Sequence, residues 1–337
     1  MKKILSIIGI LALIGLGSAA YIYSLLFSSP FQHTETAYVY IDKDDTADSI
    51  RNKVQTAGQA KSMNGYDLMS KLKKYGDKHR TGRYAIKPGA CMYNLVREMN
   101  NGIQVPTKII IPTARTVEKV TGVIARSLMM DSVSLASTLK EQMETLGYTK
   151  ETLPALFIPD TYEVYWDITP ENLLARLQKE HEKFWNAERT AKAKQAGFTP
   201  NEIATLASIV ESETNYEPEK ATVAGLYINR VHKGMLLQSD PTVKFALQKF
   251  ELRRILFEHL AVDSPYNTYK YAGVPPGPIC IPSKKGLDAV LNYEHHDYLY
   301  MCAKEDFSGS HNFAVGLAEH MQNARKYQQA LNARGIK

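Results

Sequence analysis

Residues 199–242 read TPNEIATLASIVESETNYEPEKATVAGLYINRVHKGMLLQSDPT, and they predict a buried helix that ends in two glutamates. Thr199 is suited to cap this helix, Pro200 fits its first position, and Glu202 completes a capping box. An apolar stripe follows at helical spacing, formed by Ile203, Leu206, Ala207 and Val210. Carboxylates at the end of a buried stripe are costly unless a site uses them, so this helix is the first candidate for a functional site.

The two glutamates differ in their position around the helix. At about 100° per residue, Glu213 falls on the flank of Leu206 and Ile209, whereas Glu211 falls on the opposite flank, further from the stripe. Desolvation raises the pKa of a carboxyl, which is what a general acid near neutral pH requires, so Glu213 is the better candidate. Glu211 is interpreted as a salt-bridging or supporting residue. A solvated last turn without function is the alternative for both.

Several segments, in order along the chain, resemble the YceG-like family of endolytic murein transglycosylases. The segments are LFIPDTYEV (156–164), IVESETNYEPEKATVAGLYINRVHKGMLLQSDPTV (209–243), SPYNTY (264–269), GVPPGPICIPS (273–283), YLYM (298–301) and SHNF (310–313). Each segment is weak alone, but their shared order is specific. The family's catalytic glutamate is followed by threonine, and this pattern corresponds to Glu213.

The resemblance implies an enzyme of the lyase class that cleaves the MurNAc–GlcNAc bond of peptidoglycan without water. One carboxyl, Glu213, would first donate a proton to the glycosidic oxygen and then accept one from the muramic acid 6-hydroxyl, leaving a 1,6-anhydro end. No metal or organic cofactor is expected. Two alternatives stay open. Asp240 would be the second carboxylate of a muramidase-type hydrolase, and a glycan-binding scaffold without activity would need neither residue.

Other polar residues of these segments are expected to shape a sugar cleft. A loop before Pro241 would present hydroxyl, amide and carboxyl groups, because the residue before a proline avoids helical dihedral angles. Tyrosines near residue 267 offer a stacking face beside an amide. Ordinary turn chemistry is the alternative for the loop residues. The predicted substrate-binding residues are Glu211, Gln238, Ser239, Asp240, Thr242, Tyr266, Asn267, Tyr269 and His311.

The N-terminus contains a segment long enough to cross a membrane. Residues 4–27 carry no charge and follow two lysines, which favours a single-pass anchor with a cytoplasmic N-terminus and the rest of the chain on the periplasmic side of the inner membrane. Ser18–Ala20 could instead end a cleaved signal peptide, although the apolar run continues to Phe27.

The 337 residues leave room for about two domains beyond this segment. We predict an α+β chain: residues 1–3 cytoplasmic, 4–27 transmembrane, 28–102 a small α+β module, and 103–337 a mixed α+β catalytic domain with a lysozyme-like catalytic helix. The resemblance implies that the small module is LysM-like and binds glycan. The expected strands are 36–41, 83–86 and 107–111, and the expected helices are 45–54, 66–72, 92–99, 116–128, 132–146 and one long helix over 170–195.

Composition and charge give limited information about partners and cofactors. The net charge of +6 fits an anionic wall or a lipid surface but decides little, and no basic run with interleaved aromatics suggests nucleic acid. The resemblance implies peptidoglycan strands and peptidoglycan synthases as partners. Three cysteines allow a Cys280–Cys302 disulfide or free thiols, with Cys91 left over. The adjacent histidines at 295 and 296 point apart on most backbones, so no metal site is predicted.

Overall fold

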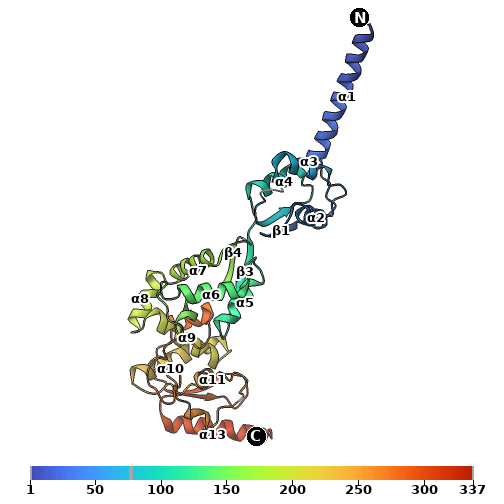
Figure 1. The fold of residues 1–337 in the computed structure, drawn as a ribbon. Helices are drawn as coiled ribbons and strands as arrows, with labels where there is room; N and C mark the ends of the chain where they lie inside the picture. Colours follow the sequence, from blue (N-terminus) through green and yellow to red (C-terminus); the bar gives the residue numbers. More distant parts are fainter. Residues whose placement is uncertain (1, 76–78, 253, 336–337) are drawn as a thin grey trace. The chain divides into compact units, whose positions relative to one another are not determined.

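The computed structural model describes residues 2–75, 79–252 and 254–335, which form two compact units (Figure 1). The units are Met1–Ile109 with Ser127–Met130 and Glu163–Thr169, and Ile110–Arg126 with Asp131–Tyr162 and Pro170–Lys337. The described chain contains both helices and short two-stranded sheets, so the predicted mixed α+β class is confirmed. The division into domains at residue 102 stays a prediction.

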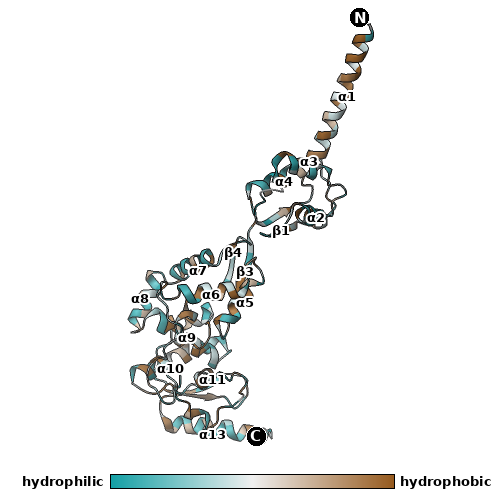
Figure 2. Cartoon of the chain, viewed as in Figure 1, coloured by the Kyte–Doolittle hydropathy of each residue, from teal (hydrophilic) through white to brown (hydrophobic). Residues whose placement is uncertain are grey.

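Helix α1 (Lys2–Phe27) is apolar over nearly its whole length (Figure 2). Residues Lys3–Phe27 reach a mean hydropathy of 2.2, and the apolar stretch has no share buried inside the protein. A helix of this length rises about 37 Å, which exceeds the roughly 30 Å of a bilayer's hydrocarbon core. The segment is therefore long and apolar enough to be a membrane anchor or a signal sequence.

The first unit contains an antiparallel ribbon that shares a core with three helices. Strand β1 (Ala37–Ile41) pairs with β2 (Gly82–Ile86), and Val39 lies opposite Tyr84. Strand β1 buries Val39 and Ile41, as alternation with a period of two predicts. The helices are α2 (Ala47–Gly58), α3 (Asn64–Lys73) and α4 (Met92–Asn101). Each predicted element of this region is present, with ends shifted by a few residues.

A second two-stranded sheet pairs β3 (Thr107–Ile111) with β4 (Asp160–Val164). Strand β3 has the predicted bounds. Between these strands lie helices α5 (Val117–Ala125) and α6 (Ser132–Gln142) and the 3₁₀ turn η2 (Leu153–Leu156). Both helices were expected, and both end a few residues earlier than the sequence pattern suggests.

The charged segment 170–195 forms two helices where the sequence predicts one. Helix α7 (Pro170–Phe184) ends before Trp185, and α8 (Ala187–Gln195) begins after Asn186. The Asn186 backbone is extended, and its side-chain oxygen accepts a hydrogen bond from the N–H of Arg189 at 2.9 Å. The prediction of one helix was wrong because a capping asparagine starts a new helix without disturbing the amphipathic pattern.

Helix α9 (Pro200–Glu213) lies in the core of the second unit. Its predicted capping box is confirmed: the Thr199 hydroxyl accepts from the N–H of Glu202, whose carboxylate accepts from the N–H of Thr199 at 2.8 Å. All residues from 203 to 210 are buried, so the helix is enclosed on every side rather than along one stripe. This enclosure fixes the last turn, which carries both glutamates.

The remaining elements surround α9. They are η3 (Glu217–Glu219), α10 (Lys220–His232), α11 (Asp240–Leu247), η4 (His259–Ala261), α12 (Lys284–Leu291), β5 (Tyr300–Ala303), β6 (His311–Ala314) and α13 (Leu317–Ala333). Helices α10 and α12 pack on α9, and α13 packs on the antiparallel β5–β6 hairpin. Gly225 of α10 allows the close approach of residue 294, because a Cβ there would lie 2.3 Å from the Glu294 carbonyl oxygen.

Candidate active site

Glu213 is the last residue of α9, and its carboxyl enters a cleft of about 250 Å³. The cleft is bounded by α9, α10, the segment leading into α11, and the two strands of the β5–β6 hairpin. Its lining residues are Glu213, Leu226, Tyr227, Arg230, Leu237, Gln238, Asp240, Tyr269, Met301, Cys302, Ala303 and His311. Polar and titratable groups therefore converge on one carboxyl at the end of an apolar helix.

Two hydroxyls hold a single oxygen of this carboxyl. Tyr227 Oη donates to Glu213 Oε1 at 2.8 Å, and Ser239 Oγ donates to the same atom at 2.5 Å. No hydrogen bond from the described residues reaches Oε2. The arrangement orients the carboxyl through one oxygen alone.

The environment of Glu213 favours its protonated form. Burial raises the pKa of Glu213 above its ordinary value of 4.5, and the nearby charge of Asp240 adds to the rise. The hydroxyls of Ser239 and Tyr227 oppose it because they stabilise the carboxylate, and His311 opposes it weakly. The effect of burial on the pKa is the largest, so the carboxyl favours its protonated form and can donate a proton. Burial also raises the pKa of Tyr227 well above 10, which keeps its hydroxyl a donor.

Asp240 lines the same cleft but has a different partner. Tyr269 Oη donates to Asp240 Oδ1 at 2.6 Å, and burial together with this contact raises the pKa of Tyr269. Asp240 was expected in a loop, but it is the first residue of α11. That expectation was wrong because Pro241 fits a first helical turn, where its missing N–H leaves no hydrogen bond broken.

Glu211 lies outside the Glu213 cleft and lines a separate cavity. Its Oε2 lies 3.2 Å from the Nζ of Lys220, which is buried, and accepts from Ser283 Oγ at 2.8 Å. A Cβ at Gly286 would lie 2.5 Å from the same oxygen, so a larger residue there would displace the Glu211 carboxylate. The salt bridge expected from the helical angles is present, and the geometry gives Glu211 no contact with the cleft.

Three of the other predicted residues do not line the cleft. Thr242 is fully buried, and its hydroxyl donates to the Ser239 carbonyl at 2.7 Å. Asn267 is fully buried, and its amide donates to two backbone carbonyls while its oxygen accepts from the N–H of Tyr269. Tyr266 packs on Phe245 with ring centroids 4.7 Å apart and does not line the cleft. The predicted residues that do line it, besides Glu213, are Gln238, Asp240, Tyr269 and His311.

A buried carboxylate that the sequence did not single out holds His311. Glu219 is 6% exposed, and its Oε1 lies 2.7 Å from His311 Nδ1, while its Oε2 accepts from the backbone N–H of His311 at 3.0 Å. The Thr214 hydroxyl donates to Glu219 Oε1 at 2.6 Å. Glu219 thus ties the residue after Glu213 to the strand that carries His311. Its short-range signal, an acidic residue within a charged run, does not distinguish it from Glu217.

Tyr227 and Arg230 were also missed. They lie three residues apart on α10, a largely buried helix, and this spacing places both on one face. Arg230 donates to the carbonyls of Leu299 at 2.6 Å and Leu237 at 2.8 Å, so it joins the hairpin to the segment before α11. A tyrosine and an arginine at this spacing in a buried helix were the available signal.

The cysteines and histidines form no further reactive centre among the described residues. Cys91, Cys280 and Cys302 are free thiols, so the alternative of a Cys280–Cys302 disulfide is not realised. His296 is held by the Thr222 carbonyl at 2.9 Å and by the N–H of Tyr298. No group of three metal-ligating side chains occurs within residues 2–75, 79–252 and 254–335.

Comparison with known families shows the class of protein to which this fold and its carboxyl-centred cleft belong. Residues 39–326 match the YceG-like family, and the chain belongs to that family. An endolytic murein transglycosylase of Bacillus subtilis strain 168 is 32% identical over 184 residues, which cover 54% of this chain and 50% of the relative. One of Streptococcus pneumoniae serotype 2 is 26% identical over 96% of this chain and 65% of the relative. The chain thus spans between half and two thirds of the length of these relatives.

A solved structure shares the fold. The crystal structure of a putative yceG-like protein from Listeria monocytogenes matches with a TM-score of 0.54 at 23% identity, covering 86% of this chain and 99% of the other. The family expected from the ordered motifs is therefore confirmed.

Proposed function

We propose that this protein is a membrane-anchored lytic transglycosylase that cuts peptidoglycan strands internally at the MurNAc–GlcNAc bond. The observation that carries the proposal is Glu213, a carboxyl whose pKa is raised by burial and whose Oε1 is held by two hydroxyl donors. The relatives named endolytic murein transglycosylases support it.

The reaction would use Glu213 twice. Its proton passes to the glycosidic oxygen as the bond from C1 of muramic acid breaks, and the GlcNAc-bearing fragment leaves. The carboxylate then accepts the proton of the muramic acid 6-hydroxyl, whose oxygen bonds to C1 and closes a 1,6-anhydro ring. The proton balance closes and no water is consumed. Tyr227 and Ser239 would stabilise the carboxylate between the two steps, since both donate to it.

The other parts of the chain would place this chemistry at the wall. Helix α1 would anchor the protein in the inner membrane, with its N-terminus cytoplasmic and residues 28–337 periplasmic. The module at 28–102 would be LysM-like and bind glycan, and peptidoglycan synthases would supply nascent strands. Cuts close to the membrane would then limit strand length.

A muramidase-type hydrolysis is the second candidate, because the Asp240 carboxyl lines the same cleft as Glu213. Asp240 would stabilise or attack the sugar, and water would complete the reaction. The hydrogen bond from Tyr269 would hold the Asp240 carboxyl in place in the cleft.

Mass spectrometry of cleavage products separates these proposals. Full-length protein in detergent is incubated with uncrosslinked glycan strands, beside Glu213→Gln and the matched Glu211→Gln variant. We expect internal cuts that end in 1,6-anhydromuramic acid and that disappear only in Glu213→Gln. Products with ordinary reducing ends, one water heavier than the anhydro form, would assign the hydrolase instead if Asp240→Asn no longer forms them. Intact strands with wild-type protein would leave a binding scaffold.

A further inference from the structure

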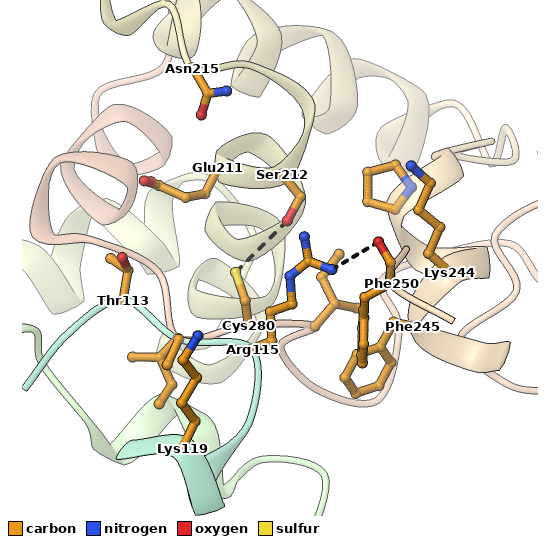
Figure 3. A pocket seen from close by; sticks show the side chains of 14 residues that line it. Thr113, Arg115, Lys119, Glu211, Ser212, Asn215, Lys244, Phe245, Phe250 and Cys280 are labelled. Atoms are coloured by element: carbon orange, nitrogen blue, oxygen red, sulfur yellow. Dashed lines mark hydrogen bonds between the residues drawn. The ribbon is translucent and has the colours of Figure 1, made fainter. Parts of the chain in front are cut away.

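A second cavity lies on the Glu211 side of α9 and is larger than the cleft (Figure 3). Its volume is about 440 Å³, against about 250 Å³ for the cleft that holds Glu213. Consecutive residues of two helices line the two spaces: Ser212 faces the cavity beside Glu213 of the cleft, and Pro241 faces the cavity beside Asp240 of the cleft. The cavity and the cleft are therefore immediate neighbours.

The cavity has an excess of positive charge. Arg115, Lys119 and Lys244 line it, and none of them forms an ion pair with a carboxylate of the described residues. The one acidic side chain on its wall is Glu211, which is already paired with Lys220. Three cations thus face a space in which no described carboxylate is free to balance them.

Arg115 is the central side chain of this cavity. Figure 3 shows it projecting between Ser212 and Cys280 on one side and Phe250 on the other. Its Nη1 donates to the Phe250 carbonyl at 3.4 Å, and its guanidinium carbon lies 4.9 Å from the centroid of the Phe250 ring. These two contacts steady the guanidinium and leave its other donors open. A guanidinium of this kind binds a planar carboxylate through two parallel hydrogen bonds.

The chemistry of the cavity is that of binding, not of bond making. Its one thiol, Cys280, has a pKa raised to about 11 by burial, so it stays protonated and unreactive at neutral pH. Phe245 and Phe250 add apolar surface next to the cations. The lining therefore suits a ligand that joins a carboxylate to small apolar groups.

We propose that this cavity binds a carboxylate of the peptide stem borne by the glycan strand that is cut at Glu213. The proposal rests on the proposed function. Amidated muramic acid and N-acetylglucosamine carry no charge, so three cations would contribute little to holding the sugars themselves. The stems branch from the strand, contain alanine methyl groups and end in carboxylates. A cationic, partly apolar cavity next to the cleft, rather than inside it, fits such a branch.

Kinetics on paired substrates test the peptide site. Full-length protein in detergent acts on uncrosslinked strands with intact stems and on the same strands after an amidase has removed the stems, which leaves only a short lactyl carboxylate on each muramic acid. For Arg115→Gln we expect KM on stem-bearing strands to rise about tenfold, with kcat unchanged and the denuded strands cleaved as before. Lys244→Gln should raise KM less. Lys179→Gln removes an exposed cation of α7 that does not line the cavity and is the matched control.

Binding measured without turnover distinguishes the two ways of failing. In the Glu213→Gln background, adding Arg115→Gln should weaken affinity for stem-bearing strands about tenfold and leave affinity for denuded strands unchanged. If wild-type protein makes no cut but this binding difference holds, the proposed function fails and the peptide site stands. If wild-type protein cuts both strands with one KM and Arg115→Gln changes neither, the peptide site is overturned and the function stands.

Phosphate is the other source of an anion, since a lipid-linked strand ends in a diphosphate. Inorganic pyrophosphate is therefore added as a competitor. Inhibition that Arg115→Gln relieves, combined with equal KM values for stem-bearing and denuded strands, would assign the cavity to phosphate and overturn the carboxylate proposal. Stem-dependent KM values that pyrophosphate does not alter would support it.

Discussion

Glu211 and Glu213 lie in the same turn of α9 but have opposite environments. Among the described residues Glu213 has only hydroxyl partners, Tyr227 and Ser239, and burial raises its pKa. Glu211, two residues earlier, has a buried lysine at 3.2 Å and forms an ion pair. The two residues belong to the same helix, are of the same type and lie at nearly the same distance from the end of that helix. The comparison shows that the partners supplied by α10, α12 and the segment before α11 decide which carboxyl can act as an acid.

The largest expected effect is the loss of activity in Glu213→Gln. A positioned general acid contributes about 10²- to 10⁴-fold to a rate, so kcat should fall by about 10³-fold. Glu211→Gln, the matched control, should retain kcat within a few fold because Glu211 does not line the cleft. Release of anhydro-ended fragments measures both. Equal losses in the two variants would break the comparison.

For stability the order of the two variants should reverse. In Glu211→Gln the Lys220 side chain, 4% exposed, keeps one ionic partner from the described part of the chain, Glu217, which is 48% exposed. Breaking a buried pair costs about 3–5 kcal/mol, and the 23% exposure of Glu211 reduces that to about 2 kcal/mol. We expect the thermal midpoint to fall by about 4 °C. Glu217→Gln, which removes the more exposed partner, should lower it less; an equal fall would contradict the assignment of Glu211 as the main partner.

Glu213→Gln should instead gain stability relative to wild type as pH rises. The pKa of Glu213 is higher in the folded than in the unfolded chain, so its favourable contribution is fully present below about 4.5 and is lost as pH rises through the folded value. Glutamine has no proton to lose. The midpoint difference between Glu213→Gln and wild type should therefore grow from pH 4 to pH 8. A difference that is constant over this range would mean that the carboxyl is not desolvated.

The sequence predicted what depends on neighbours along the chain. The capping box of α9 and the flank on which Glu213 lies follow from spacing within one helix, and strand β1 of the first unit's ribbon follows from alternation. The threonine that follows Glu213, as in the family's pattern, further distinguished Glu213 from Glu211.

What the sequence missed depends on distant partners or on local competition. Tyr227 reaches Glu213 from 14 positions away and Ser239 from 26, while Glu219 and His311 are 92 positions apart. Periodicity has no information about such contacts. The start of α8 at Asn186 was missed for a local reason, since one side-chain cap can start a new helix where the pattern of charges continues unchanged.

Removing one of the two hydroxyls should shift the pKa of Glu213 without abolishing activity. The Ser239 hydroxyl lowers the pKa of Glu213 by stabilising its carboxylate, so Ser239→Ala should raise that pKa further. Activity needs the protonated acid and falls as pH rises through this pKa; the basic limb of the rate profile should therefore move to higher pH. We expect kcat to fall about tenfold, because a hydrogen bond to a charged group contributes about 1.5 kcal/mol.

Ser212→Ala is the control for that pH profile. Ser212 precedes Glu213, but its hydroxyl donates to the Ser208 carbonyl of its own helix at 2.8 Å and does not contact the carboxyl. Its basic limb should coincide with that of wild type. A shift toward lower pH in Ser239→Ala would show that the hydroxyl favours the protonated form instead.

The smallest effect is expected at the other end of α9. Thr199→Ala removes the N-cap that binds the N–H of Glu202, at a cost of about 1 kcal/mol and a fall of roughly 2 °C in the thermal midpoint. The helix of 14 residues is about 21 Å long, so Glu213 is a whole helix away from the substituted cap. The basic limb of the pH–rate profile of Thr199→Ala should therefore coincide with that of wild type. If the basic limb moved, the environment of Glu213 would depend on the placement of the entire helix, and the contrast between the two glutamates could not be assigned to their partners alone.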